Sequence, residues 1–165
     1  GSTIGNFTML EAARLLTRMR RLAGPGGAVL IGFDLLKDRA RLLAAYDDAE
    51  GVTAAFNRHL LEHLHRALGA DFDPSAFAHR APFNEDASRI EMHLVSRRHQ
   101  TVRLDGHTFR FGPGDVIVTE HSHKYAPDAF AALAASAGLF AVGSWTDPER
   151  LFCVQLLEGE VSEEV

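Results

Sequence analysis

The chain has 165 residues, of which 46% are hydrophobic and 24% are charged, a composition that is typical of a folded globular protein and excludes a disordered tail. Its net charge of −5 gives no electrostatic reason to expect nucleic acid or an anionic membrane as a partner. Nothing resembles a signal peptide, and no apolar run approaches the roughly 20 residues that span a bilayer. The single cysteine, Cys153, lies in an apolar run and is expected to be buried. We therefore expect a cytoplasmic protein that binds neither nucleic acid nor a membrane.

The N-terminal part of the chain combines helix and strand patterns. Residues 1–7, GSTIGNF, have the pattern of a strand end that runs into a turn, and because a domain seldom begins inside its own core, we expect a truncated chain. Apolar residues at helical spacing predict a helix over 9–23, closed by the glycine-rich turn 24–27. The continuous apolar run over 28–33 predicts a strand buried on both faces, as in a parallel sheet. Residues 38–46 predict a short second helix.

The middle of the chain is helical at first and then changes to strand periodicity. Residues 50–68 predict a long helix with one apolar stripe, which consists of Val52, Phe56, Leu60, Leu64 and Leu68. After Pro74 the pattern predicts strands over residues 89–96, 101–104, 108–111 and 115–122. Asp105-Gly106 lies where a hairpin turn needs these two residue types.

The C-terminal part returns to alternating helix and strand. Residues 127–137 predict a helix, with strands over 139–145 and 150–157 after it and a frayed tail over 159–165. The order of the elements predicts an α/β fold class with an insertion. We expect one sheet domain, formed by residues 1–45 and 126–158, and an inserted α+β domain formed by residues 46–125.

The strand over residues 115–122 carries a pattern with chemical meaning. Because alternate strand residues share a face, Glu120 and Ser122 extend an apolar row that begins with Val116 and Val118, and this row is expected to face an interior or a cleft. A carboxylate and a hydroxyl two residues apart can bind the two nitrogens of an imidazole ring. The alternative from the pattern alone is a glutamate held by local hydrogen bonds at a strand end.

Seven strings resemble one known family. They are GSTIGNF (1–7), IGFDLLKD (31–38), LLAAYD (42–47), VTAAFNRHLL (52–61), SRIEMHLVS (88–96), TEHSHKY (119–125) and WTDPERLF (145–152). In this order they resemble the histidine-specific, S-adenosylmethionine-dependent methyltransferases of ergothioneine biosynthesis, over nearly the whole chain. The resemblance implies the C-terminal part of a Rossmann-like class I methyltransferase sheet, with an inserted histidine-binding domain. It also implies three methylations of the α-amino group of L-histidine, which give trimethylhistidine, and a monomer when the protein is complete.

The resemblance also implies roles for individual residues. Gly1 and Asn6 belong to a substrate loop, in which Asn6 orients the substrate α-amino group, and Tyr46 binds the substrate carboxylate. Glu120 and Ser122 bind the imidazole ring, so that an amino acid without the ring leaves a polar pair without partners.

Phe56 and Met92 resemble apolar walls around the substrate. Phe56 lies on the apolar stripe of its helix, and Met92 shares a strand face with Ile90 and Leu94. The alternative for both residues is an ordinary place in the hydrophobic core.

The sequence departs from the family pattern in two ways. His121 and His123 stand where the family more often has asparagine and tyrosine. The glycine-rich loop and the acidic residue that bind S-adenosylmethionine in such folds are absent, and the turns at 24–27 and 112–114 lead into strands instead. We therefore expect the chain alone to be inactive, with its cofactor-binding residues unknown.

Two other functions remain as alternatives. In the first alternative, the chain is a non-catalytic module that binds histidine or another amino acid. In the second alternative, it binds zinc. His59, Glu62 and His63 match the H-x-x-E-H pattern of inverted zinc proteases, with both histidines on one helical face. The pattern is short and the chain has nine histidines, so chance matches are common.

Overall fold

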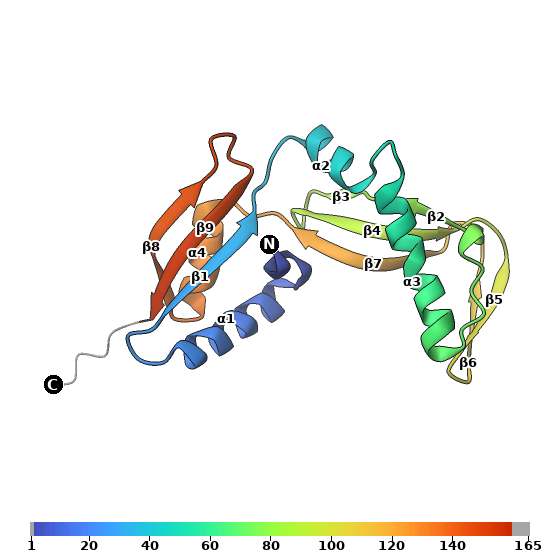
Figure 1. Ribbon diagram of the computed structural model, residues 1–165, viewed down its shortest axis with the longest axis horizontal. Helices are drawn as coiled ribbons and strands as arrows, with labels where there is room; N and C mark the ends of the chain where they lie inside the picture. The colour runs from blue at the N-terminus through green and yellow to red at the C-terminus, as the bar shows by residue number, and fades with distance from the viewer. Residues whose placement is uncertain (1, 160–165) are drawn as a thin grey trace. The chain divides into compact units, whose positions relative to one another are not determined.

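The computed structural model describes residues 2–159, which form two compact units (Figure 1). The first unit consists of Gly1–Lys37, Glu85–Arg89 and Ser122–Val165, and the second consists of Asp38–Asn84 and Ile90–His121. By contacts, the second unit therefore starts before the expected insertion boundary at residue 46 and ends before residue 125. The α/β fold class is confirmed, because both units combine helices with sheets.

The first unit is built on a three-stranded sheet with the order β1-β9-β8, visible in Figure 1. The strands are β1 (Ala28–Asp34), β8 (Leu139–Thr146) and β9 (Phe152–Gly159). Both outer strands run antiparallel to β9 and are therefore parallel to each other. The prediction of a tail over 159–165 was wrong for Gly159, which ends β9, while residues 160–165 lie outside the described residues.

The interpretation of β1 as a strand buried on both faces was wrong for the described residues. Val29 and Ile31 are buried, but Leu30 between them is 65% exposed. The neighbour of β1 in the sheet is the antiparallel strand β9, and residues 2–159 leave one face of the sheet uncovered. A continuous apolar run reports the hydrophobicity of a strand, but it does not report whether both faces are covered.

Two helices pack on the covered face of this sheet. They are α1 (Met9–Ala23) and α4 (Pro127–Ser136), and they share a buried core with Phe33, Leu139 and Leu157. The predicted range 9–23 matches α1, and α4 ends one residue before the predicted end at 137; the signals at the ends of both helices are local. Thr8 and Glu11 form a reciprocal capping box at the start of α1, and Gly138 follows α4 with a φ of 75°.

The first residues of the chain do not form the predicted strand end. Thr3–Asn6 form a 3-10 helix, η1, which begins where the Gly5 N–H donates to the Ser2 carbonyl. The Ser2 hydroxyl accepts a hydrogen bond from the Asp34 N–H at 2.9 Å, and this bond ties η1 to the end of β1.

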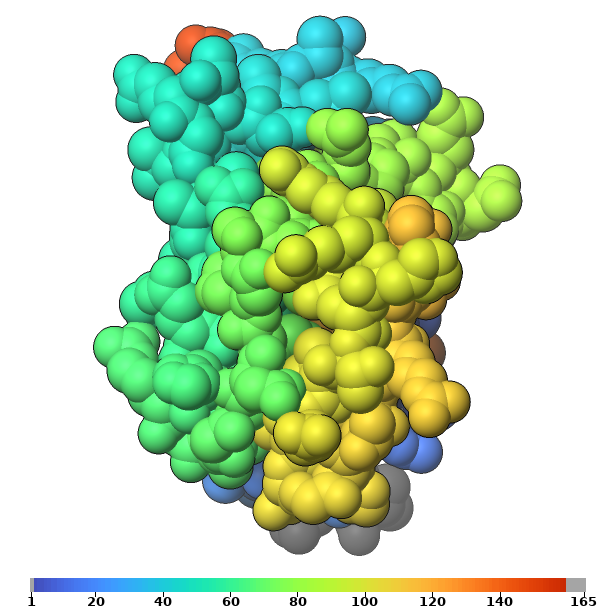
Figure 2. Space-filling model, turned by 90° about the vertical axis from the view of Figure 1, so that its right-hand side faces the viewer, coloured from blue at the N-terminus to red at the C-terminus, as the bar shows by residue number. Residues whose placement is uncertain are grey.

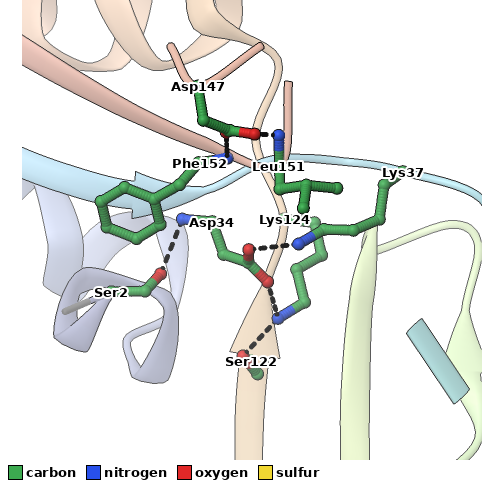
Figure 3. Close-up of polar contacts among 8 residues, drawn as sticks. All are labelled: Ser2, Asp34, Lys37, Ser122, Lys124, Asp147, Leu151 and Phe152. Atoms are coloured by element: carbon green, nitrogen blue, oxygen red, sulfur yellow. Dashed lines mark hydrogen bonds and ion pairs between the residues drawn. The ribbon is translucent and has the colours of Figure 1, made fainter. Parts of the chain in front are cut away.

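A polar turn joins β8 to β9 (Figure 3). One carboxylate oxygen of Asp147 accepts the N–H groups of Leu151 and Phe152 at 2.7 and 2.8 Å. The hydrogen bond from Phe152 is the main reason why the pKa of Asp147 lies below its usual value. In the next strand, Cys153 is fully buried, as the sequence predicted.

The second unit contains two helices and a small sheet. The helices are α2 (Arg39–Tyr46) and α3 (Val52–Leu68), and a short 3-10 helix, η2 (Pro74–Ala76), follows them. The strand β4 (Arg89–Ser96) pairs with three others, which are β2 (Phe77–Arg80), β3 (Phe83–Asn84) and β7 (Val116–His123). Neither β2 nor β3 was predicted, because strands of four and two residues are too short to show a hydrophobic period.

A separate hairpin consists of β5 (Gln100–Leu104) and β6 (His107–Phe111). Its predicted turn is confirmed, because Asp105 and Gly106 both have positive φ angles. In Figure 2 the yellow surface of the hairpin lies against the green surface of the end of α3 and the segment after it. The Asp71 N–H donates to the Arg103 carbonyl and joins that segment to the hairpin.

The predicted apolar stripe of α3 is not the side of the helix that is buried. Asn57 and Leu61 are the buried residues of α3, whereas Val52 is 63% exposed and Phe56 is 69% exposed. Hydrophobic periodicity identifies the most apolar face of a helix. In this helix, however, the side that packs on the sheet is held by a hydrogen-bonded asparagine.

The inward row predicted on β7 was also wrong in its first half. Val116 and Val118 are 46% and 47% exposed, while Ile117 packs against the core of the second unit. Further along the strand, Glu120 is half-buried and Ser122 is buried.

None of the helices within residues 2–159 has both the length and the apolar character that a membrane crossing requires.

Candidate functional site

The second unit contains a cavity of about 320 Å³, a size at the lower end of small-molecule sites. It lies between α3, β4 and β7. The residues that line it are Phe56, Asn57, His59, Leu60, His63, Met92, Thr119 and Glu120. Three of the residues proposed from the sequence, Phe56, Met92 and Glu120, therefore lie around one cavity, although they are separated in the chain by up to 64 positions.

The apolar surface of the cavity comes from side chains with different degrees of burial. Met92 on β4 is only 3% exposed, so it belongs to the packed interior of the unit. Phe56 and Leu60, which lie one turn apart on α3, remain exposed and border the cavity from the helix. Exposed apolar side chains at the edge of a cavity can bury their surface against a ligand. For that reason, the exposure of Phe56 is compatible with a binding role.

Two polar side chains of the cavity are already engaged with each other. The Thr119 hydroxyl donates to Asn57 Oδ1 at 2.6 Å, and Asn57 is 3% exposed. The Asn57 amide nitrogen lies 3.0 Å from His79 Nδ1 and donates to the His93 carbonyl at 3.2 Å. These contacts use both hydrogens of the amide and a lone pair of its oxygen. Asn57 is thus a structural anchor beside the cavity.

Glu120 differs from these polar neighbours. Its half-buried carboxylate makes no hydrogen bond or ion pair with any residue between 2 and 159. The alternative from the sequence, a glutamate held by local hydrogen bonds, therefore does not hold for the described part of the chain. A carboxylate accepts hydrogen bonds and donates none when it is ionised. In an apolar cavity, such a group is suited to bind an N–H donor.

The proposed zinc motif has a different role in the structure. His59 Nδ1 contacts Glu62 Oε2 at 3.0 Å, and Arg66 lies 3.0 Å from His59 Nε2. Because arginine can only donate, Nε2 accepts and Nδ1 donates its hydrogen to Glu62. Both ring nitrogens of His59 are thus occupied, and residues 2–159 contain no group of three potential metal ligands.

Tyr46 is not among the residues that line the cavity. It is half-buried at the end of α2, where it packs against Leu42, Ala81 and Ile90. Its carbonyl oxygen lies 2.8 Å from Nε2 of the buried His79. His79 in turn contacts Asn57, so two hydrogen-bonded side chains connect Tyr46 to the cavity. This connection was not predicted, because no local sequence pattern marks a histidine as buried.

In the first unit, Ser122 belongs to a buried charge cluster (Figure 3). The Lys124 ammonium donates to the Ser122 hydroxyl at 2.8 Å and lies 2.7 Å from Asp34 Oδ2. The other oxygen of Asp34 contacts the Lys37 ammonium at 2.6 Å. Two of the strings that carry the family resemblance, IGFDLLKD and TEHSHKY, thus meet in one cluster. Of these four residues only Ser122 was predicted from the sequence, whereas Asp34, Lys37 and Lys124 were not.

The loop proposed to orient the substrate amine also lies in the first unit. Asn6 is exposed at the end of η1, and Gly1 lies outside the described residues. His123 Nδ1 donates to the Gly5 carbonyl at 3.0 Å, which fixes η1 to the end of β7. The backbone approach is close enough that a Cβ on Gly5 would lie 2.9 Å from the His123 carbonyl oxygen. Position 5 therefore requires glycine if this approach is to be kept.

The chain resembles one known protein family over almost its whole length. A family model described as histidine-specific, SAM-dependent methyltransferase matches residues 1–159. The histidine N-alpha-methyltransferase of Mycolicibacterium smegmatis is 46% identical over 158 residues, which cover 94% of this chain and 49% of the relative. The protein of the same name from Mycobacterium tuberculosis has the same identity and coverage.

A more distant relative is a fungal protein. Ergothioneine biosynthesis protein 1 of Neurospora crassa is 27% identical over 160 residues, covering 88% of this chain and 17% of that protein. The chain spans about half the length of the two mycobacterial relatives.

Proposed function

The chain belongs to the family of histidine-specific, S-adenosylmethionine-dependent methyltransferases, and on that basis we propose that it serves methyl transfer to the α-amino group of L-histidine. The proposal includes successive transfers that give trimethylhistidine, as a step of ergothioneine biosynthesis. The names of the mycobacterial and fungal relatives support both parts. The whole activity is a proposal because the chain spans about half of the mycobacterial proteins.

The observation that carries the proposal is the uncommitted carboxylate of Glu120. Among the polar groups of the cavity, Asn57 and Thr119 satisfy each other, whereas Glu120 has no partner among residues 2–159. A half-buried carboxylate without a partner is unfavourable unless a ligand supplies a donor. The N–H of an imidazole ring is such a donor, and the apolar surfaces of Phe56 and Met92 suit the faces of the ring.

We assign the second imidazole nitrogen to Ser122, which follows Glu120 by two residues in β7. The Ser122 hydroxyl accepts a hydrogen bond from Lys124, and a hydroxyl can donate its own hydrogen as well. An amino acid without an imidazole would leave the carboxylate of Glu120 desolvated and without a donor. Losses of this kind produce strong discrimination between substrates.

The remaining residues of the proposal bind the amino-acid part of the substrate. Tyr46 is assigned to the carboxylate and Asn6 to the α-amino group, with Gly1 in the same loop as Asn6. Transfer of a methyl group from a sulfonium to a neutral amine needs little covalent help from the protein. Orientation of the amine lone pair supplies most of the gain, on the order of several kcal/mol. Asn6 is therefore proposed as an orienting residue, and no general base is assigned.

S-adenosylmethionine supplies the electrophilic methyl group in this family. Residues 2–159 do not contain the loop that would hold it, because no glycine-rich turn among them leads from a strand into a helix. The turn at Gly24 and Gly26 leads from α1 into β1, in the opposite order. We therefore assign no cofactor-binding residues. In this proposal the residues of this chain bind and orient the acceptor.

The same observation favours one alternative, a chain that binds histidine without transferring a methyl group. Both functions use the cavity around Glu120, so the alternative changes the outcome of an activity assay but does not change the binding site. The zinc alternative is not proposed again, since His59 is engaged by Glu62 and Arg66.

The proposal is tested by methyl transfer in the complete gene product. Transfer from S-adenosylmethionine with a labelled methyl group is measured for L-histidine and for L-alanine, which has no ring. We expect Glu120→Ala to lower kcat/KM for histidine by about 10- to 100-fold, the value of one charge-assisted hydrogen bond. The slow reaction with alanine should not change.

Glu62→Ala is the matched control, because Glu62 carries the same charge on the exposed surface of α3 outside the cavity lining. This variant should keep the preference for histidine. If Glu120→Ala leaves the ratio of histidine to alanine unchanged, the cavity does not choose the substrate. If the wild-type protein binds histidine but transfers no methyl group to it, the non-catalytic alternative is correct.

A further inference from the structure

A chain of four hydrogen-bonded groups runs beneath the cavity of the second unit. It begins at the Thr119 hydroxyl, passes through the Asn57 amide and the His79 ring, and ends at the carbonyl of Tyr46. The contacts are short, at 2.6, 3.0 and 2.8 Å in that order. Two residues at one end line the cavity, and the last group belongs to the residue proposed to bind the substrate carboxylate.

The last group of this hydrogen-bonded series, the Tyr46 carbonyl, determines which atoms of the series carry a hydrogen. A backbone carbonyl can only accept, so Nε2 of His79 must carry the hydrogen that it donates to Tyr46. In the neutral ring Nδ1 is then bare, and it accepts a hydrogen from the Asn57 amide nitrogen. The second amide hydrogen goes to the His93 carbonyl, which leaves Oδ1 for the Thr119 hydroxyl.

The reverse orientation of the Asn57 amide fails at two contacts. A flipped amide would place its oxygen against the bare Nδ1 of His79 and against the His93 carbonyl, both of which are acceptors. These contacts therefore fix the orientation of the Asn57 amide and the tautomer of the neutral His79 ring, while the Thr119 hydroxyl also lies 3.0 Å from the Met92 carbonyl. A carboxylate oxygen of Asp47, whose side chain is 49% exposed, lies 4.0 Å from Nε2 of His79.

Burial makes this arrangement costly to disturb. Asn57 is 3% exposed and His79 is 5% exposed, so water cannot readily replace a missing partner. Such buried polar groups must find their hydrogen bonds within the protein, and a satisfied network makes its surroundings rigid. The end of α2 is thus held to the cavity by side-chain bonds as well as by apolar packing.

From this geometry we infer that Asn57 and His79 are positioning residues for the carboxylate of the substrate. His79 holds the backbone of Tyr46, and Asn57 holds His79 in the one tautomer that can do so. The inference rests on the proposed function, because it takes over the assignment of Tyr46 to the carboxylate. It predicts that the two residues matter more for ligands that carry a carboxylate than for ligands that do not.

The first arm of the test is spectroscopic and does not depend on activity. In protein labelled with ¹⁵N in the histidine rings, protonated and bare ring nitrogens give different chemical shifts. His79 should show a protonated Nε2 and a bare Nδ1. A bare Nε2 would overturn the inference, because the bond to the Tyr46 carbonyl would then have no hydrogen.

The second arm compares binding of L-histidine with binding of histamine, which has the same ring and amine but no carboxylate. In the complete gene product we expect the wild type to bind histidine more tightly than histamine. His79→Leu and Asn57→Leu should reduce that preference by about three- to tenfold, the value of one hydrogen bond, because histidine binding weakens more than histamine binding. His79→Gln, which can still donate to the Tyr46 carbonyl, should restore part of the preference.

His65→Leu is the matched control. His65 on α3 also contacts a backbone carbonyl through its ring, that of Ala70 at 2.6 Å, but it does not line the cavity. This variant should keep the full preference for histidine. It separates the proposed role from the general loss of a histidine–carbonyl bond in this unit.

The outcomes distinguish the inference from the proposed function. A wild-type protein that binds histidine no better than histamine contradicts the assignment of Tyr46, and with it the proposed function. A wild type with the expected preference, combined with variants that keep it, overturns the inference alone. Variants that weaken both ligands equally also overturn it, because they show a general loss of the cavity. If His79→Leu does not fold, His79→Gln and Asn57→Leu decide the question.

Discussion

The ammonium of Lys124 lies 2.7 Å from Oδ2 of Asp34, and the lysine side chain has no exposed surface. Asp34 ends β1 and Lys124 directly follows β7, so this ion pair fixes the two strand ends to each other within the first unit. Lys37 contacts the second oxygen of Asp34 and is partly exposed. In these contacts two lysines share one carboxylate, and the lysine that is fully buried is Lys124.

This imbalance predicts unequal effects of substitution. Asp34→Asn removes the carboxylate that lies 2.7 Å from the buried ammonium of Lys124 and should lower the free energy of unfolding by about 3–5 kcal/mol. Lys124→Met removes that charge, leaves Asp34 paired with Lys37, and should cost only about 1–2 kcal/mol for the lost bond to Ser122. Urea unfolding can follow the first unit specifically, because the only tryptophan, Trp145, lies in β8.

The double variant provides the control for this prediction. Asp34→Asn combined with Lys124→Met should be more stable than Asp34→Asn alone, since the fully buried ammonium no longer faces a neutral amide. Equal costs for the two single variants would show that the pair is not desolvated as the structure indicates.

The buried hydroxyl of Tyr125 predicts that its removal does not destabilise the protein. Its hydroxyl is buried without a hydrogen-bond partner among residues 2–159, while its ring packs against Phe33 and Phe130. Tyr125→Phe keeps the ring contacts and removes an unsatisfied polar group, so it should be neutral or stabilising by up to about 1 kcal/mol. Trp145 fluorescence in urea measures the change. A loss of more than about 1 kcal/mol would mean that the hydroxyl has a partner in solution.

The same tyrosine predicts a response to alkaline pH. Burial raises the pKa of Tyr125 from 10.0 to about 12. A raised pKa favours the neutral form in the folded state, so the contribution to stability is complete below pH 10 and is lost as pH rises toward 12. Wild type should therefore lose more stability than Tyr125→Phe over this interval. Parallel losses in the two proteins would contradict the shift.

The lowered pKa of Asp48 predicts that the stability of the folded state falls at acid pH. Its carboxylate accepts the N–H groups of Val52 and Thr53 at 2.8 Å, and these residues begin α3. The hydrogen bonds from Thr53, first that of its side chain, lower the pKa of Asp48 from 3.8 to about 2. A lowered pKa stabilises the folded state above pH 3.8, and this contribution is lost as pH falls toward 2.

NMR of the Asp48 carboxyl carbon measures this directly, and the amide of Val52 should titrate with it. In Asp48→Asn the Val52 amide should no longer respond to pH in this interval, because the asparagine oxygen accepts without titrating. A midpoint near 3.8 in the wild type would show that the carboxylate does not cap the helix.

Local signals explain which parts of the fold the sequence could predict. The ends of α1 and α4 depend on Thr8, Glu11 and Gly138, which act on their own helices. The faces of α3 and β7 depend instead on what packs against them. Val52 and Val118 are exposed for this reason, although they are as apolar as core residues. Hydrophobic periodicity carries no information about which faces are covered.

The candidate site shows the same limit. Phe56, Met92 and Glu120 were proposed from the strings that resemble the family, and the structure brings these three around one cavity. Asn57 and His79 were missed, although Asn57 lies beside Phe56 in the same string. Their role depends on burial and on partners that are distant in the chain, such as Thr119, 62 residues away from Asn57.

The most direct test of the account is the response of the methionine methyl groups to L-histidine. The chain has three methionines, and only Met92 lines the cavity, whereas Met9 and Met19 lie in α1 of the first unit. In protein labelled with ¹³C at the methionine methyls, added L-histidine should shift the signal of Met92 and leave those of Met9 and Met19 in place. In Glu120→Gln the same shift should require a higher histidine concentration. A Met92 signal that does not move at saturating histidine, or a shift confined to Met9 or Met19, would contradict the assignment of this cavity to the substrate.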